Sequence, residues 1–262
     1  MDGVNRTMYI PLYGKSYVSQ KGLILHDPTA EEIWEKESFP LDRKAKSKWL
    51  AYYMGMRSAV FDGWVREKLV QDKTAVVLHL GCGMDSRCNR VGTENTLWFD
   101  VDFPEVIEER RKYYWETDHY RMISADVRCP DYLKALPQDG AAIVVMEGIS
   151  MYLQSSDLQA VLRTLKNHFG EVFLLMDCYT TFAAKVSKYK NPIHQVGVTQ
   201  VYGLDDPEAL AKATGINVVN ELEMTPRDLI AQLPKGEQGV FRRLYAGGIS
   251  RKMYRLYEFF AP

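Results

Sequence analysis

Short runs of apolar residues alternate along the chain with segments whose apolar positions recur every three or four residues. Seven runs of strand character begin near residues 75, 96, 120, 141, 171, 216 and 252. Segments of helical spacing lie between the first six. Ser156-Asp-Leu-Gln159 resembles a capping box, and Asp206-Pro207 marks another helix start. Strands that alternate with helices predict an α/β fold in which neighbouring strands run parallel.

Three regions lie outside this alternation. The spacing of Trp49, Tyr53, Met56, Val60 and Trp64 predicts a helix over about 41–70, preceded by an irregular segment that contains Lys15. Segments 178–203 and 224–250 leave the sheet on or near its ligand side and are candidate lids. Their apolar and aromatic residues suit a moderately apolar acceptor; they are Tyr179, Phe182, Tyr189, His194, Leu229, Leu233, Phe241 and Tyr245.

A glycine turn after the first strand is the most informative local pattern. The run Ala75-Val-Val-Leu-His-Leu ends in Gly81-Cys-Gly83, and the next strand, 96–102, ends with Asp100 and Asp102. Glycines let the backbone approach a ligand closely, and a carboxylate at the tip of the following strand accepts hydrogen bonds from ribose hydroxyls. The pattern therefore predicts a nucleoside site at the carboxyl ends of the strands.

The acids on the next two strands favour one nucleoside over another. A dinucleotide fingerprint requires a third glycine, and Ser86 occupies that position. Asp126 and Glu147 end the following strands, where they would repel a diphosphate but suit the amine and hydroxyl groups of S-adenosylmethionine. An NAD-dependent oxidoreductase is accordingly disfavoured.

Composition narrows the remaining classes. The 262 residues carry 33 Lys plus Arg against 34 Asp plus Glu, so a net charge of −1 gives no electrostatic reason to expect nucleic acid or an anionic membrane as partner. The four cysteines form no Cys-x-x-Cys pair, so we expect neither a metal site nor a disulfide framework. No apolar stretch reaches the roughly 20 residues of a membrane helix, and we expect a cytoplasmic protein.

These motifs together resemble the leucine carboxyl methyltransferase superfamily, and within it the bacterial polyketide-synthesis O-methyltransferases of the tetracenomycin type. The likeness runs over about residues 9–260. It is carried by Leu78-His-Leu-Gly-Cys-Gly-Met-Asp-Ser-Arg87, Trp98-Phe-Asp-Val-Asp-Phe-Pro-Glu105, Ser124-Ala-Asp126, Glu147-Gly-Ile-Ser-Met-Tyr-Leu153 and Arg251-Lys-Met-Tyr254. Met84, Cys88 and His79 depart from the family pattern without touching the charged positions.

The resemblance implies a class I S-adenosylmethionine-dependent methyltransferase fold, a Rossmann-like seven-stranded sheet with the last strand antiparallel. We expect one domain over 1–262, comprising an N-terminal helical extension (1–72), a cofactor-binding core (73–177), and lid segments with the C-terminal strands (178–262). It would use S-adenosylmethionine and no metal.

The resemblance also implies roles for individual residues. Gly81 and Gly83 would lie under the cofactor, and Asp102 or Asp100 would bind its ribose. Asp126 and Val127 would flank the adenine, Arg57 would pair with the methionine carboxylate, and Glu147 would lie beside the methionine amine. Lys15 and Tyr152 would point toward the substrate. The residues implied are Lys15, Arg57, Gly81, Gly83, Asp100, Asp102, Asp126, Val127, Glu147 and Tyr152.

Methyl transfer to an oxygen of a small molecule is the leading hypothesis. The protein has to align the reacting atoms and exclude water, and a carboxylate acceptor needs no general base because it is already ionised near pH 7. A hydroxyl acceptor would need one, and no histidine dyad stands out, which mildly favours a carboxylate or an acidic phenol. A non-catalytic S-adenosylmethionine sensor or scaffold and a protein C-terminal carboxyl methyltransferase remain as alternatives, and the acceptor and oligomeric state stay open.

Overall fold

The computed structural model describes residues 7–37, 39, 41, 43–92, 96–187 and 200–262. Its seven-stranded sheet has the order β3-β2-β1-β4-β5-β7-β6. The strands are β1 (Val76–Leu80), β2 (Trp98–Asp102), β3 (Tyr120–Ser124), β4 (Ala141–Met146), β5 (Glu171–Tyr179), β6 (Asn217–Leu222) and β7 (Tyr254–Ala261). The first five pair in parallel, and β7 runs antiparallel to both β5 and β6. The predicted sheet is confirmed, including its antiparallel last strand.

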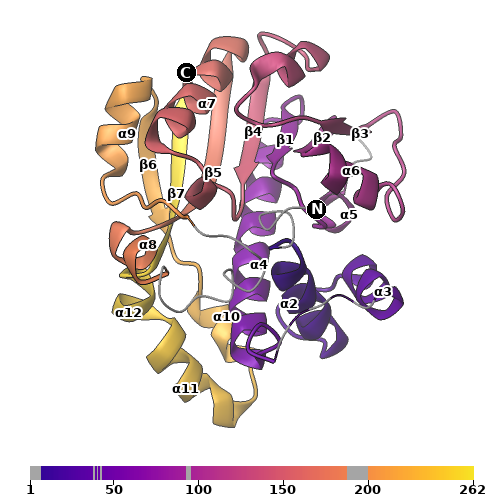
Figure 1. Ribbon diagram of the computed structural model, residues 1–262, viewed down its shortest axis with the longest axis vertical. Helices are drawn as coiled ribbons and strands as arrows, with labels where there is room; N and C mark the ends of the chain where they lie inside the picture. Colours follow the sequence, from indigo (N-terminus) through magenta and orange to yellow (C-terminus); the bar gives the residue numbers. More distant parts are fainter. Residues whose placement is uncertain (1–6, 38, 40, 42, 93–95, 188–199) are drawn as a thin grey trace.

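Helices cover both faces of the sheet and extend below it (Figure 1). Those of the first half are α2 (Tyr9–Gln20), α3 (Pro28–Lys36), α4 (Lys48–Gln71), α5 (Arg87–Val91), α6 (Pro104–Arg110), and the 3₁₀ turns η1 (Pro130–Ala135) and η2 (Ser150–Tyr152). Those of the second half are α7 (Ser155–His168), α8 (Thr181–Ser187), α9 (Pro207–Thr214), α10 (Arg227–Ala231), α11 (Lys235–Tyr245) and α12 (Gly247–Arg251). In Figure 1 the sheet fills the upper half, with α2, α3, α10, α11 and α12 in the lower half.

Successive side chains of the central strands point to opposite faces of the sheet and so form two hydrophobic cores, one on each face. On β1, Val77 packs with α4 and α6 residues in one core, while Val76, Leu78 and Leu80 belong to the other, under α7 and α9. All five residues of β1 are buried because helices cover both faces, as is typical of parallel strands. The sheet is thus a rigid platform with its carboxyl ends directed at the lower helices.

The N-terminal extension is more ordered than the sequence suggested. The segment expected to be irregular forms α2 and α3, and the helix expected over 41–70 begins only at Lys48. The helix predicted over 41–70 is confirmed except at its start, whereas α2 was missed because it is buried on several sides. α2 and α4 are in direct contact. They pack so closely that a Cβ on Gly14 would lie 2.7 Å from Met54 Cβ, and one on Gly55 would lie 2.8 Å from a Val18 methyl. This contact holds Lys15 and Arg57 above the sheet.

Two predicted helix starts have different outcomes. Asp206 caps α9 by accepting the backbone N–H of Ala209, and Gly215 ends that helix in the left-handed conformation, as expected. The capping box proposed at Ser156 is wrong, because α7 begins at Ser155 and its N-cap, Gln154, makes no side-chain capping bond. Among the helices of the described residues, none is long and apolar enough to cross a membrane.

Candidate cofactor and acceptor site

A cavity of about 630 Å³ opens where the carboxyl ends of β1, β2 and β4 meet the helices of both chain ends. Open α/β sheets bind ligands in this place, where the strand order reverses between β1 and β4. Nine of the ten residues implied by the sequence line it, namely Lys15, Arg57, Gly81, Gly83, Asp102, Asp126, Val127, Glu147 and Tyr152. Asp100 does not. The cavity is therefore where the sequence motifs converge.

The glycine turn forms the floor of the cavity. Gly81 and Gly83 have positive φ values of 66° and 51°, which side-chain-bearing residues rarely adopt. A Cβ on Gly81 would also lie 2.0 Å from a methyl carbon of Ile149, so no side chain fits there without displacing the β4–η2 turn. The turn leaves backbone exposed toward the cavity, as a close ligand contact requires.

The structure separates the two aspartates of β2. Asp102 lines the cavity, and its carboxylate accepts the backbone N–H groups of Gly83 (2.7 Å) and Phe103 (2.8 Å). Burial raises the pKa of Asp102 to about 6 despite these two bonds. The Asp102 carboxylate lies beside the glycine turn, where it can accept hydrogen bonds from the hydroxyl groups of a ligand.

Asp100 points beneath the turn instead, which corrects its candidacy as a ribose ligand. Its carboxylate is 1% exposed, pairs with Arg110, and accepts from Tyr120 Oη at 2.7 Å and Trp98 Nε1 at 2.9 Å. Arg110 donates in turn to the carbonyls of Gly83 and Asp85, each at 2.8 Å. Asp100 and Arg110 therefore fasten the glycine turn from below.

Asp126 and Val127 line the cavity just beyond the end of β3. The Asp126 carboxylate is held by Arg128, with Nε at 2.9 and 3.0 Å from its two oxygens. These hydrogen bonds lower the pKa of Asp126. Phe103 and Leu153 also line the cavity. The combination of a flat apolar surface and a carboxylate suits a purine ring with an exocyclic amine.

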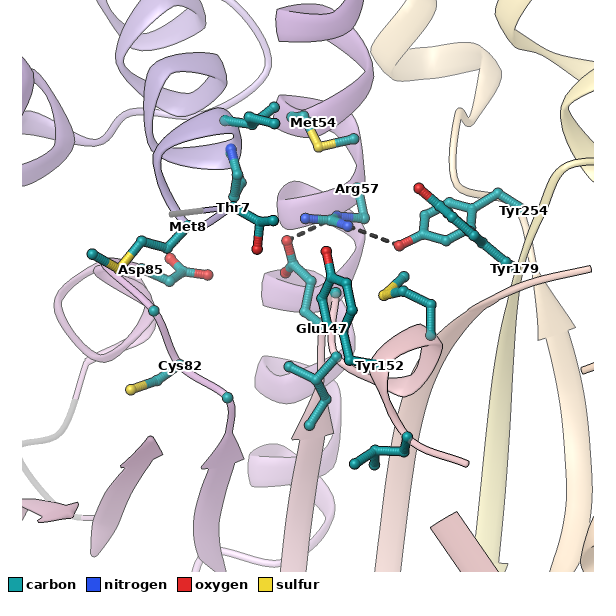
Figure 2. Close-up of a pocket in the computed structure, with 18 of the residues that line it drawn as sticks. Thr7, Met8, Met54, Arg57, Cys82, Asp85, Glu147, Tyr152, Tyr179 and Tyr254 are labelled. Carbon is teal, nitrogen blue, oxygen red and sulfur yellow. Dashed lines mark hydrogen bonds and ion pairs between the residues drawn. The ribbon is translucent and has the colours of Figure 1, made fainter. Parts of the chain in front are cut away.

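Arg57 joins the tips of β4, β5 and β7. Its Nε lies 3.0 Å from Glu147 Oε1, and its Nη1 lies 3.0 Å from both Asp177 Oδ2 and Tyr254 Oη. Figure 2 shows Glu147 on one side of the guanidinium and Tyr254 on the other. Gly148 leaves room for this arrangement, since a Cβ there would lie 3.4 Å from Arg57 Nη1. Although burial alone would raise it, Arg57 and Arg87 lower the pKa of Glu147 to about 2.

Lys15 and Tyr152, the proposed substrate residues, both line the cavity but in different settings. Lys15 is 2% exposed, and its Nζ lies 3.2 Å from Asp85 Oδ1. Burial lowers the pKa of Lys15, against the opposing influence of Asp85. Tyr152 extends from η2, and in Figure 2 its hydroxyl points toward Arg57 and Glu147. Burial raises the pKa of Tyr152, which keeps it a neutral phenol.

The lid segments reach the cavity, though through a different set of residues. Of those named from the sequence, Tyr179 and Tyr245 line it. Phe182 is 57% exposed and does not, whereas Leu233 and Phe241 are buried in a separate core with Tyr52 of α4. Tyr189 and His194 lie outside the described residues. The rest of this lining comes from α8, the end of α11, α12 and the turn before β7, with Ala183, Val186, Ser187, Leu244, Ile249, Ser250 and Met253.

Sequence reasoning missed four site residues that the structure brings together: Asp85, Arg87, Asp177 and Tyr254. Asp85 and Arg87 lie in the motif after Gly83, where they form buried ion pairs with Lys15 and Glu147. Asp177 is the acid at the end of the apolar run Glu171–Asp177, two residues before the end of β5, so its position near a strand tip was a usable signal. Tyr254 belongs to a motif of the family likeness, but its place beside β5 depends on the antiparallel pairing of β7, which the sequence does not specify.

Comparison with known proteins agrees with this geometry. Two solved structures share the fold: a putative methyltransferase from Thermobifida fusca YX (TM-score 0.56, 14% identity, 94% of this chain and 93% of that one) and magnesium protoporphyrin IX methyltransferase (ChlM) from Synechocystis PCC 6803 with bound SAH (TM-score 0.52, 11% identity, 98% and 100%). The sheet and its site define a class I methyltransferase that uses S-adenosylmethionine.

Sequence comparison identifies the family. The leucine carboxyl methyltransferase family profile matches residues 12–166. Tetracenomycin polyketide synthesis O-methyltransferase TcmP of Streptomyces glaucescens is 30% identical over 243 residues, which cover 92% of this chain and 90% of TcmP. The S-adenosyl-L-methionine-dependent methyltransferase dpfgK of Gibberella zeae is 24% identical over 233 residues, 80% of this chain and 78% of dpfgK. The chain belongs to the leucine carboxyl methyltransferase family, as its motifs predicted.

The support beneath the glycine turn can be tested with two adjacent arginines. Replacing Arg110 by Ala leaves Asp100 as a buried, unpaired charge and should lower the free energy of unfolding by about 3–5 kcal/mol. Arg111, whose side chain is 48% exposed and pairs with Glu116 at 3.2 Å, is the control. Arg111→Ala should cost less than about 1 kcal/mol, as for exposed ion pairs. Urea denaturation followed by circular dichroism measures both, and equal costs would contradict a structural role for Asp100 and Arg110.

Proposed function

We propose that this methyltransferase transfers the methyl group of S-adenosylmethionine to an oxygen of a small, moderately apolar molecule. The observation that carries the proposal is one cavity shared by the glycine turn, the acids at the strand tips and an aromatic wall to which α4, β5, α11 and β7 each contribute a tyrosine. That wall, formed by Tyr53, Tyr179, Tyr245 and Tyr254 with neighbouring methionines, suits a planar or apolar acceptor better than a nucleic acid, which basic residues would hold. The likeness to TcmP, a polyketide O-methyltransferase by name, supports the same acceptor class.

The residues on the cavity wall fit the parts of the cofactor. Asp102 would accept from the ribose hydroxyls over Gly81 and Gly83, and Asp126 with Val127 would flank the adenine. Arg57 would pair with the methionine carboxylate, and Glu147 would accept from the amine. The fit is supported by the bare backbone at Gly81 and by the Arg57 guanidinium, whose Nε and Nη1 contact protein groups and so fix its orientation, leaving Nη2 as the nitrogen that would contact the ligand carboxylate. The bound cofactor supplies an activated methyl group on a sulfonium.

Lys15 and Tyr152 would orient the acceptor while the lid segments exclude water. Tyr152 is a half-buried neutral phenol and can donate a hydrogen bond to the acceptor oxygen. The Lys15 ammonium, held by Asp85, adds positive charge at the same end of the cavity. Alignment in a dry site is the main catalytic requirement when the methyl donor is already reactive.

Transfer of a tritiated methyl group from S-adenosylmethionine tests the acceptor class. The probes are hydroxyanthraquinones, anthraquinone carboxylic acids and a short peptide ending in leucine. We expect label in an aromatic probe, as a base-labile ester for a carboxyl acceptor or a base-stable ether for a hydroxyl. Label found in the peptide alone would replace the proposal by protein carboxyl methylation.

Arg57 should matter to cofactor affinity through its geometry as well as its charge. Arg57→Ala is expected to weaken S-adenosylhomocysteine binding by roughly 2–4 kcal/mol, the scale for losing one partner of a buried charged hydrogen bond. Arg57→Lys should recover only part of this, because a single ammonium cannot contact Glu147, Asp177 and a ligand carboxylate from three fixed nitrogens as the guanidinium can. Isothermal titration calorimetry provides the measurement, with Arg66→Ala, an exposed arginine on the same helix, as control. Unchanged affinity in a folded Arg57→Ala protein would assign Arg57 to structure alone.

Asp102 predicts a pH dependence of cofactor binding. Ribose hydroxyls donate to the ionised carboxylate, so binding favours the deprotonated form of a group whose pKa is about 6. Affinity for S-adenosylhomocysteine should therefore rise with pH up to about 6 and level off above it, with a slope of at most about tenfold per pH unit. Asp102→Asn should bind weakly with no such slope, whereas Asp126→Asn should retain it because Arg128 holds the pKa of Asp126 low. A flat profile in the wild type would argue against ribose contact by Asp102.

A further inference from the structure

A connected set of buried ion pairs lies between the glycine turn and the N-terminal helices. Arg90 contacts Asp27 (2.7 Å), Asp62 (2.6 Å) and Asp85 (2.8 Å), and Arg87 contacts Asp62, Asp85 and Glu147. Lys15 joins through Asp85, and Arg57 links Glu147 to Asp177. We call these groups the buried ion network; its members are Lys15, Arg57, Arg87, Arg90, Asp27, Asp62, Asp85, Glu147 and Asp177.

The buried ion network is not neutral. It holds four cations and five carboxylates, and each member's side chain is at most 7% exposed. His79 touches Arg87 through Nε2 (3.1 Å), but burial lowers the pKa of His79 and keeps it uncharged. With every member ionised, the network therefore carries one negative charge in excess. A buried charge without a counter-ion is costly, so this excess needs an explanation.

The pattern of ion pairs shows that the excess negative charge of the buried ion network lies at Asp177. Asp62, Asp85 and Glu147 each contact at least two cations of the network. Asp27 contacts only Arg90, yet it also caps α3, where the helix dipole adds positive potential. Asp177 contacts only Arg57, which it shares with Glu147, and its other partners are the uncharged Tyr254 hydroxyl (2.7 Å) and the Gly148 N–H (2.7 Å).

Within the part of the chain that the structure describes, the surroundings of Asp177 supply no second cation. The charged groups that face it are Arg57 on α4 and Glu147 after β4, and the other titratable groups are Tyr53, Tyr152, Tyr254 and Cys178. Burial raises the pKa of each of these phenols and of the thiol, so they stay neutral. Burial, only partly opposed by Arg57, also raises the pKa of Asp177 itself.

The cofactor S-adenosylmethionine carries one more positive charge than its demethylated product S-adenosylhomocysteine, and one positive charge is what the buried ion network needs to be neutral. At neutral pH S-adenosylmethionine carries an ammonium, a carboxylate and a sulfonium, a net charge of +1, whereas S-adenosylhomocysteine is a neutral zwitterion. We propose that Asp177 is a specificity-determining residue that makes the cavity prefer S-adenosylmethionine over S-adenosylhomocysteine, by holding the one buried negative charge that no cation of the network balances. This rests on the proposed cofactor site at Arg57 and Glu147.

The proposal has a proton-linked consequence. The positive cofactor favours ionised Asp177, so its binding releases any proton held there, whereas the neutral product does not displace it. Preference for S-adenosylmethionine should therefore increase as pH rises through the pKa of Asp177. Asp102 also titrates, but it would contact the ribose that both ligands share. Its contribution cancels in the ratio of their dissociation constants.

Isothermal titration of both ligands against matched variants tests the role of Asp177. Asp177→Asn should raise the ratio Kd(S-adenosylmethionine)/Kd(S-adenosylhomocysteine) by about tenfold, the scale of a unit charge about 10 Å away at an effective dielectric constant of about 20. Tyr254→Phe removes a hydrogen bond to Asp177 but leaves its charge, and should keep the ratio near the wild-type value. Glu258→Gln, which removes a buried carboxylate paired with Lys68 outside the network, should also leave it unchanged.

The number of protons released on ligand binding gives a second test, because it would not differ between the two ligands if Asp177 had only a structural role. Titrations of the wild type in pairs of buffers that differ in ionisation enthalpy and are chosen to buffer at each pH, over about pH 5 to 8, should show more protons released by S-adenosylmethionine than by S-adenosylhomocysteine. A ratio within twofold of wild type in Asp177→Asn, with both ligands bound, overturns the proposal. If that variant does not fold, equal proton release by the two ligands in the wild type overturns it. Failure of either ligand to bind the wild type would instead refute the cofactor site.

Discussion

The pairing of Arg57 with acids from separate strand tips is the interaction on which the site depends. A single guanidinium on α4 meets Glu147 after β4, Asp177 on β5 and Tyr254 on β7, so the helix, three strands and the cavity share one fixed point. Removing one partner would leave the others buried without compensation, which costs far more than an exposed ion pair contributes. The arrangement thus ties the position of the N-terminal extension to the shape of the cavity.

The same contact relates stability to function. Buried ion pairs are weak evidence for stability, because hydrophobic replacements of similar shape are often as stable. Around this cavity, with the proposed cofactor bound, they would hold charged groups at fixed positions beside a ligand whose own charges change during the reaction. Charged groups that are already in place do not have to reorient when the reaction occurs. Avoiding this reorganisation is a main source of electrostatic stabilisation of transition states in enzymes.

Sequence periodicity predicted the sheet well because buried parallel strands are short, continuous apolar runs that end at recognisable turns. It failed for α2, whose burial on several sides hides the one-faced pattern that marks a surface helix. It also placed Asp100 and Asp102 as equivalents. Alternation along a strand put both on the same face, but only the chain beyond the strand decides which one reaches the cavity and which is covered by Arg110.

Long-range pairing explains the residues that sequence could not supply. Tyr254 lies beside Tyr179 only because β7 inserts between β5 and β6. That insertion also has a consequence for the order of folding. During synthesis β5 and β6 emerge before the strand that separates them, so β5 presents an unpaired edge and β6 has no neighbour until β7 arrives. The strands around the glycine turn, β1 to β4, can therefore pair before β7 is made, whereas the tips of β5 and β7 are brought together only afterwards.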